Sequence, residues 1–178
     1  TNETIWELGS NELELIAGDN IIRPDASSGP VYETPPLEYD LYFGGLPRLH
    51  VKVSTATVGG QIYALLEDCD DGNCIHIGHA IMDLRYHAGG SQEQAWTPLL
   101  DEITALMEFF PMDVEVKAGH TIRLTLLSTG EDYLPSAAST IVTVIESGST
   151  LQLDAFSPSS KQYYQTVQCS AQICLDNA

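Results

Sequence analysis

The sequence is poor in basic residues. Seven Lys and Arg residues stand against 25 Asp and Glu residues, which gives a formal net charge of -18 at pH 7. Nucleic acid and anionic membrane surfaces are themselves negatively charged, so repulsion excludes them as partners. The acidic residues recur along the whole chain instead of forming one tail. Such a composition is typical of a domain that net charge keeps in solution, in high salt or outside the cell.

Long hydrophobic runs are missing as well. No apolar segment approaches the ~20 residues that span a bilayer, and the start of the sequence, "TNETIWELGS", lacks the basic and apolar regions of a signal peptide. We therefore expect no membrane insertion and interpret the sequence as an excised domain or a mature product. With 178 residues, 43% of them hydrophobic, the chain can form one domain with a core.

A nucleophile elbow of the form G-x-S-x-G is also absent. That motif exposes a serine hydroxyl beside an oxyanion hole, as a serine hydrolase requires. The nearest serines, Ser91 in "GGSQE" and Ser147 in "ESGST", lack the second glycine and a following helix. We assign no catalytic residue to this chain and expect no cofactor.

Alternation of apolar and polar residues is what the sequence does contain. In "RLHVKVSTA", Leu49, Val51 and Val53 occupy one side of an expected half-buried strand. Gly59 and Gly60 follow and predict a hairpin turn into residues 61–68. A long strand is expected over 75–87, others within 104–156, and a short helix only within 91–107, where Pro98 interrupts it. This spacing predicts an all-β fold, a β-sandwich.

Composition divides the chain into three parts. Residues 1–45 are rich in Pro, Gly and Ser and predict an extended arm that packs on the sandwich. Residues 46–156 form the expected sandwich core. Residues 157–178 begin with a Ser/Pro break and predict a tail or linker.

Four cysteines form two pairs with equal spacing, Cys69/Cys74 and Cys169/Cys174. A four-cysteine zinc cage is an alternative, but acidic extracellular character favours disulfides. A Cys69–Cys74 bond would close a turn in "DCDDGNC", since Asp, Gly and Asn tolerate turn geometry. Four cysteines allow three pairings, so the connectivity stays open.

Metal sites have little support. If Gly72 is placed at the sixth position of an EF-hand calcium loop, two ligand positions are occupied by Cys69 and Gly78, whose side chains offer no oxygen atom. A calcium loop of different geometry that uses Asp68, Asp70 and Asp71 remains open. His76 and His79, three residues apart on a strand, point to opposite faces unless a bulge at Gly78 reunites them. His79, Asp83 and His87 share a face but are too far apart for one ion. We predict no metal ligand.

Three aromatic residues lie in polar, loop-like segments. Trp96, Tyr163 and Tyr164 could stack on a sugar ring or a partner surface, or could cover the edge of the core.

Several ordered motifs between about residues 35 and 156 carry a resemblance to a known family. "GGLPRLHVKVST" is followed by "YALLED", a turn with Asp71 and Gly72, "IGHAIMDLRY" and "AGHTIRL". This order resembles the C-terminal domain of X-prolyl dipeptidyl-peptidases and of the related cocaine-esterase-like acyl esterases.

The resemblance implies a jelly-roll β-sandwich, similar to galactose-binding domains, that packs against an α/β-hydrolase domain of the same parent chain. That hydrolase domain carries the family's Ser/Asp/His triad, so the resemblance implies no catalytic role for His120 or Arg123, which would satisfy polar contacts of a hairpin. The expected function is a non-catalytic accessory domain of a secreted serine hydrolase, shaping substrate access or assembly. The alternative is a carbohydrate-binding or adhesive surface module, which calcium could stabilise. Further partners left open are a glycan or a second copy of the chain in a homo-oligomer, and the expected location is extracellular or at the cell surface.

Overall fold

A computed structural model describes residues 2–24, 28–130, 133–137 and 140–156 of the protein. The described part contains strands and one short 3-10 helix, η1. The strands are β1 (Asn2–Glu7), β2 (Glu14–Ala17), β3 (Ile21–Ile22), β4 (Val31–Glu33), β5 (Leu41–Gly45), β6 (Arg48–Thr55), β7 (Gln61–Asp70), β8 (Asn73–Asp83), β9 (Ile103–Glu108), β10 (Met112–Val116), β11 (Thr121–Leu127) and β12 (Val142–Phe156), and η1 is Leu84–Tyr86. None of the described helical segments has the length and hydropathy of a membrane span.

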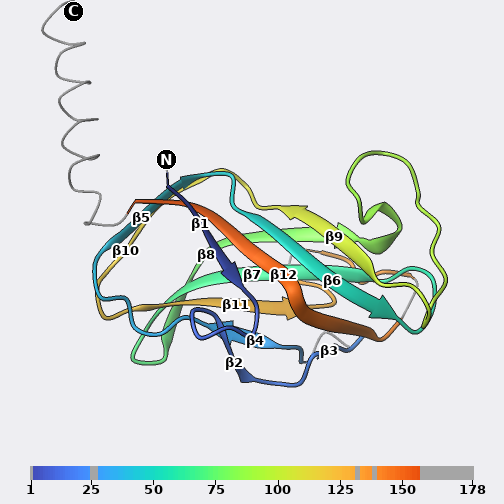
Figure 1. Cartoon of the computed structure of the whole chain (residues 1–178), viewed down its shortest axis with the longest axis horizontal. Helices are drawn as coiled ribbons and strands as arrows, with labels where there is room; N and C mark the ends of the chain where they lie inside the picture. Colours follow the sequence, from blue (N-terminus) through green and yellow to red (C-terminus); the bar gives the residue numbers. More distant parts are fainter. Residues whose placement is uncertain (1, 25–27, 131–132, 138–139, 157–178) are drawn as a thin grey trace, which may run out of the picture.

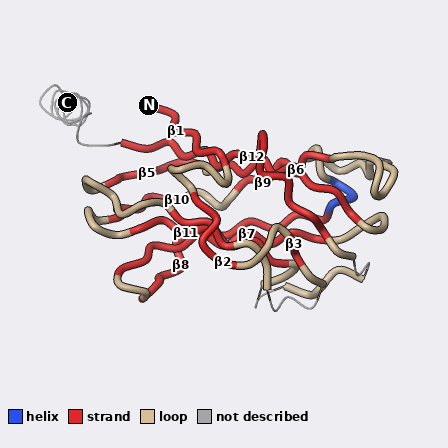
Figure 2. The backbone as a smooth tube through the Cα atoms, turned by 60° about the horizontal axis from the view of Figure 1, so that its bottom comes forward, coloured by secondary structure: helices blue, strands red, loops and turns tan. Residues whose placement is uncertain are grey.

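The strands form two antiparallel sheets that face each other (Figures 1 and 2). The seven-stranded sheet has the order β10-β5-β12-β6-β9, and β1 and β3 also pair with β12. The five-stranded sheet has the order β2-β4-β11-β7-β8. The predicted all-β sandwich is therefore confirmed.

Alternation places the core between the two sheets. On β6, Leu49, Val51 and Val53 are 0% exposed, as the sequence predicts. Ile122 and Leu124 on β11 face them from the other sheet and belong to the same hydrophobic cluster. Each such side chain contributes about 1.5–3 kcal/mol through its burial.

The hairpin predicted at Gly59 and Gly60 is wrong. β6 pairs with β9 and β12, whereas β7 pairs with β8 and β11, so the two strands lie in different sheets. The glycines have φ of 101° and 99°, and this left-handed backbone turns the chain from one sheet into the other. The alternation of side chains is the same in either case, so it could not distinguish a hairpin from a crossing between sheets.

The strand predicted over 75–87 ends earlier, at Asp83. The Asp83 carboxylate accepts a hydrogen bond from the backbone N–H of Arg85 at 2.9 Å and so starts η1. No helix forms within 91–107, where residues 98–100 make a turn and β9 begins at Ile103.

Residues Val142–Phe156, within the region where the sequence predicts further strands, form one long strand, β12. Its pairing with β6 slips between Ile145 and Thr150. At this irregularity the Ser149 hydroxyl accepts a hydrogen bond from the backbone N–H of Lys52 at 2.8 Å and donates one to the carbonyl of Ile145. The side chain thus satisfies backbone groups that the slip leaves unpaired, and the strand continues.

The segment before residue 46 supplies β1 to β5 to both sheets. Its Tyr32 and Phe43 are 0% and 1% exposed and belong to the common core. The division of the chain at residues 45 and 156 stays a prediction, and residues 157–178, with Cys169 and Cys174, lie outside the described part.

Candidate functional site

The stretch "DCDDGNC" forms a tight hairpin between β7 and β8. Asp71 and Gly72 have φ of 46° and 84°, the left-handed conformation that a two-residue hairpin loop needs at both positions. Cys69 and Cys74 are directly opposite each other and form a disulfide, with 4.0 Å between their Cα atoms. The predicted turn closed by a local bond is therefore present.

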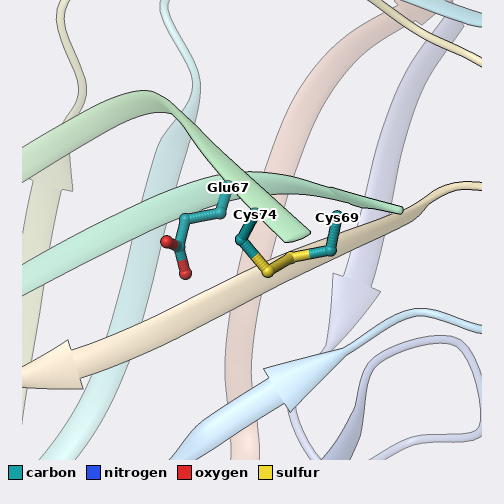
Figure 3. A group of neighbouring side chains, drawn as sticks. All are labelled: Glu67, Cys69 and Cys74. Atoms are coloured by element: carbon teal, nitrogen blue, oxygen red, sulfur yellow. A yellow bond between two sulfur atoms is a disulfide. The ribbon is translucent and has the colours of Figure 1, made fainter. Parts of the chain in front are cut away.

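One group of at least three potential metal ligands occurs among the described residues: Glu67, Cys69 and Cys74, with ligand atoms within 4.8 Å of one another. Figure 3 shows that both sulfur atoms belong to the disulfide. A disulfide sulfur has no thiolate charge, so this group is not a metal site. The Asp68 carboxylate, a candidate calcium ligand, instead contacts His120 Nδ1 at 2.8 Å.

His120 and Arg123 make polar contacts to β7 and β4 and not within a hairpin, since β10 and β11 lie in different sheets. His120 joins the start of β11 to β7 through Asp68. The Arg123 guanidinium donates from Nε to a carboxylate oxygen of Glu33 at 2.8 Å, across the β11–β4 pair. Both contacts hold neighbouring strands together.

Trp96 is buried and is not an exposed binding aromatic. Its side chain is 8% exposed, its Nε1–H donates to the Thr55 hydroxyl at 2.9 Å, and the His87 ring packs against it edge-on. Of the two readings of this residue, coverage of the core edge is the one that the structure supports. Tyr163 and Tyr164 lie outside the described residues.

A cluster of aromatic rings surrounds His79 on β8, and the sequence analysis considered only its two histidines. His79 Nδ1 lies 3.2 Å from His76 Nε2, and His79 Nε2 lies 3.0 Å from the Tyr133 hydroxyl. The Tyr63 ring stacks on His79 with centroids 5.6 Å apart, and Phe110 contacts it edge-on. The signal in the sequence was the glycine at position 78, which we identified as the place where a bulge would bring the histidines together.

A second feature that the sequence did not reveal is a group of exposed apolar side chains at one end of the sandwich, which we call the apolar end. Leu99 and Leu100 are 75% and 81% exposed, on the loop between β8 and β9. Val58 and Ile141 are 54% and 48% exposed. In Figure 1 this loop lies at the right, away from the last residues of β12.

Hydrogen bonds connect the segments of the apolar end. The backbone N–H of Leu99 donates to the carbonyl of Thr55 at 3.0 Å, and that of Ala56 donates to the carbonyl of Ile141 at 3.0 Å. The Asp101 carboxylate accepts from the backbone N–H of Thr97 and closes the loop. The exposed side chains are thus carried by fixed backbone.

Leu99 has φ of 64°, the left-handed region that bulky residues rarely occupy. This conformation costs roughly 1–2 kcal/mol. Strained backbone of this kind concentrates at functional sites, where the surrounding structure holds it. The strain here turns a large apolar side chain outward.

The family described as the X-Pro dipeptidyl-peptidase C-terminal non-catalytic domain matches residues 5–168. No curated protein sequence matches the chain significantly.

Solved structures of hydrolases share the fold. An alpha-amino acid ester hydrolase matches with a TM-score of 0.61 and 16% identity, covering 71% of this chain and 25% of that one. An aminopeptidase from a marine sediment archaeon, Thaumarchaeota archaeon, matches with a TM-score of 0.62 and 13% identity over 88% of this chain and 33% of that one. A CocE/NonD family hydrolase from Staphylococcus aureus matches with 0.62 and 10% identity over 86% and 33%.

The chain therefore spans between a quarter and a third of the length of the structures that it matches. The two-sheet fold agrees with theirs, and the family match covers nearly the whole described sandwich. The protein belongs to the family of X-Pro dipeptidyl-peptidase C-terminal non-catalytic domains.

Proposed function

We propose that this domain is the accessory β-sandwich of a serine hydrolase whose catalytic α/β-hydrolase domain lies elsewhere in the same parent chain. The observation that carries the proposal is the family match over residues 5–168. The matched structures, an ester hydrolase, an aminopeptidase and a CocE/NonD hydrolase, are three to four times longer than the segment they share with this chain. An ester or an X-Pro peptide is the substrate class that this family suggests for the parent enzyme.

The apolar end is the surface that we propose packs on the catalytic domain. The chain as a whole is acidic, with a formal net charge of -18. Four large apolar side chains on connected segments are therefore a poor match to water and a good match to a protein surface. Protein interfaces place apolar residues at their centre and charged residues at the rim, and Asp101 and Glu102 follow Leu100 directly.

This placement gives the domain its proposed role. The loop between β8 and β9 would lie against the catalytic domain and line part of the entrance to the active site. Of the three aromatic residues considered for glycan binding, Trp96 is excluded by its burial. We further propose an extracellular location, since the Cys69–Cys74 disulfide and the acidic composition are typical of secreted proteins.

The parent protein provides the test. Hydrogen–deuterium exchange of the full-length parent and of this domain alone should show amides 97–101 and 56–58, most of which are already hydrogen-bonded in the domain, more strongly protected in the parent. Leu99→Ser/Leu100→Ser should abolish that additional protection, and the matched control Ile75→Ser, at another exposed apolar position, should keep it.

Two results would contradict the proposal. Equal exchange of these segments in the parent and in the domain alone would remove the apolar end as the docking surface. A parent chain without a nucleophile elbow, or hydrolysis of ester or X-Pro substrates by this domain alone that a serine-directed inhibitor stops, would refute the accessory role.

A further inference from the structure

The pairing of β7 with β8 contains a bulge beside Gly78. Leu66 pairs with Gly78 and the next residue, Glu67, pairs with His76, so Ile77 has no partner on β7. An extra residue in one strand shifts the following side chains to the other face. His76 and His79 are three residues apart, and because of this shift they lie on the same face.

The two rings approach each other through nitrogen atoms. His76 Nε2 and His79 Nδ1 are 3.2 Å apart. Two imidazole nitrogens that bind one tetrahedral zinc ion, each at about 2.0–2.1 Å, lie about 3.3 Å apart. The observed separation is thus that of two ligands of one ion. Without an ion, the same 3.2 Å separation fits a hydrogen bond in which one ring nitrogen donates its proton to the other.

The other nitrogen of His79 decides which atom is free to bind. His79 Nε2 lies 3.0 Å from the Tyr133 hydroxyl. If Nε2–H donates to that hydroxyl, Nδ1 carries a lone pair directed at His76. Histidines that bind metals commonly donate their second N–H to such a partner, which fixes the ring and its tautomer.

The surroundings hold His79 in place and leave room beside the pair. Tyr63 stacks on the His79 ring and Phe110 contacts its edge. A depression of about 220 Å³ is lined by both histidines together with Phe110, Pro111 and Met112. This space can accept an ion with its remaining water ligands. Glu67, directly across from His76, adds negative charge on the neighbouring strand.

We propose that His76 and His79 form a binding site for a divalent transition-metal ion such as Zn²⁺ or Cu²⁺. The two ring nitrogens supply two ligands, and water or a group from a partner molecule supplies the others. Imidazole is a ligand that these ions prefer, whereas Ca²⁺ prefers oxygen. The site lies on the face of β8 and is independent of the apolar end and of the proposed accessory function.

Isothermal titration calorimetry of the tag-free full chain with ZnCl₂ at pH 7.5 tests the site. The wild-type protein should bind one Zn²⁺ and should not bind Ca²⁺. His76→Gln and His79→Gln should each weaken Zn²⁺ binding at least tenfold, and Tyr133→Phe should weaken it about tenfold, as loss of an orienting partner does. His50→Gln, on β6 of the other sheet, is the control and should bind as the wild type does.

Electron paramagnetic resonance of the Cu²⁺-loaded chain gives a second readout, in which two coordinating nitrogens should be seen in the wild type and one in each histidine variant. Circular dichroism melting of the metal-free variants checks that they fold. Wild-type Zn²⁺ affinity in a folded His76→Gln chain would overturn the proposal, because His76 is exposed and its replacement leaves the core intact. No saturable binding by the wild type would equally overturn it and leave the pair as a hydrogen bond between side chains.

Discussion

Removal of the Cys69–Cys74 disulfide should destabilise the fold, and the length of the loop that the bond closes determines by how much. The two cysteines are 5 residues apart in sequence, so the bond closes a loop of about six residues. In the chain-entropy account, closing such a loop lowers the conformational entropy of the unfolded chain by about 7 cal/mol/K, which corresponds to about 2 kcal/mol at 25 °C. Cys69→Ala/Cys74→Ser should therefore lower the free energy of unfolding by about 2 kcal/mol and Tm by about 4–8 °C.

Guanidinium denaturation followed by tryptophan fluorescence measures this change. The control is Cys169→Ser/Cys174→Ser, which keeps the hairpin disulfide. A double variant within about 0.5 kcal/mol of the wild type would refute the reasoning, because the hairpin would then be equally restricted without the bond. Peptide mapping under non-reducing conditions that pairs Cys69 with Cys169 or Cys174 would refute the connectivity itself.

Two further predictions concern the turn between the sheets and the end of β8. Gly60→Ala should lower the free energy of unfolding by about 2–4 kcal/mol, since φ is 99° and a Cβ would lie 2.5 Å from a methyl carbon of Thr140. The control Gly119→Ala, with φ of 90° and open space around the added Cβ, should lower it by about 1 kcal/mol. Urea denaturation measures both changes. The side-chain hydrogen bond from Arg85 lowers the pKa of Asp83, so this carboxylate stabilises the fold above its unfolded pKa of about 3.9, and the contribution is lost as pH falls through the lower folded pKa. Asp83→Asn should therefore lower stability by about 0.5–1 kcal/mol at pH 7 and by less at pH 2; an equal loss at both pH values would contradict the assigned cause.

Local patterns in the sequence predicted local structure well. The alternation in β6 correctly identified Leu49, Val51 and Val53 as buried, because a strand has only two faces and one of them meets the core. The turn at Asp71 and Gly72 followed from residue types that accept positive φ. The resemblance to the family rested on these same elements, and the family match confirmed it.

Arrangements between distant segments were not accessible in this way. Nothing in the alternation of β6 and β7 shows that Gly59 and Gly60 lead into another sheet. The bulge beside Gly78 depends on how β7 pairs with β8, so the sequence presented it only as a condition. The sequence left Trp96 open between a binding aromatic and coverage of the core edge, because its own segment is polar and its partner Thr55 is 41 residues away.

The apolar end was missed for a related reason. Leu99 and Leu100 occur in "PLLDE", which has the composition of a core segment. Their exposure follows from the turn at 98–100 and from the positive φ of Leu99, both of which depend on hydrogen bonds to Thr55 and within the loop. Hydrophobicity alone predicts burial and cannot identify an interface.

The position of β12 in the chain has a consequence for how the protein folds. This strand pairs with β1, β3, β5 and β6, yet it is the last of the described strands in the sequence. β1, at residues 2–7, thus pairs with residues 150–155 and must wait for them during synthesis. Pairings so distant in sequence fold slowly and leave strand edges exposed in the meantime. The seven-stranded sheet therefore completes only after residue 156 has left the ribosome, and a chain that stops before Val142 leaves β1 and β3 with no strand to join.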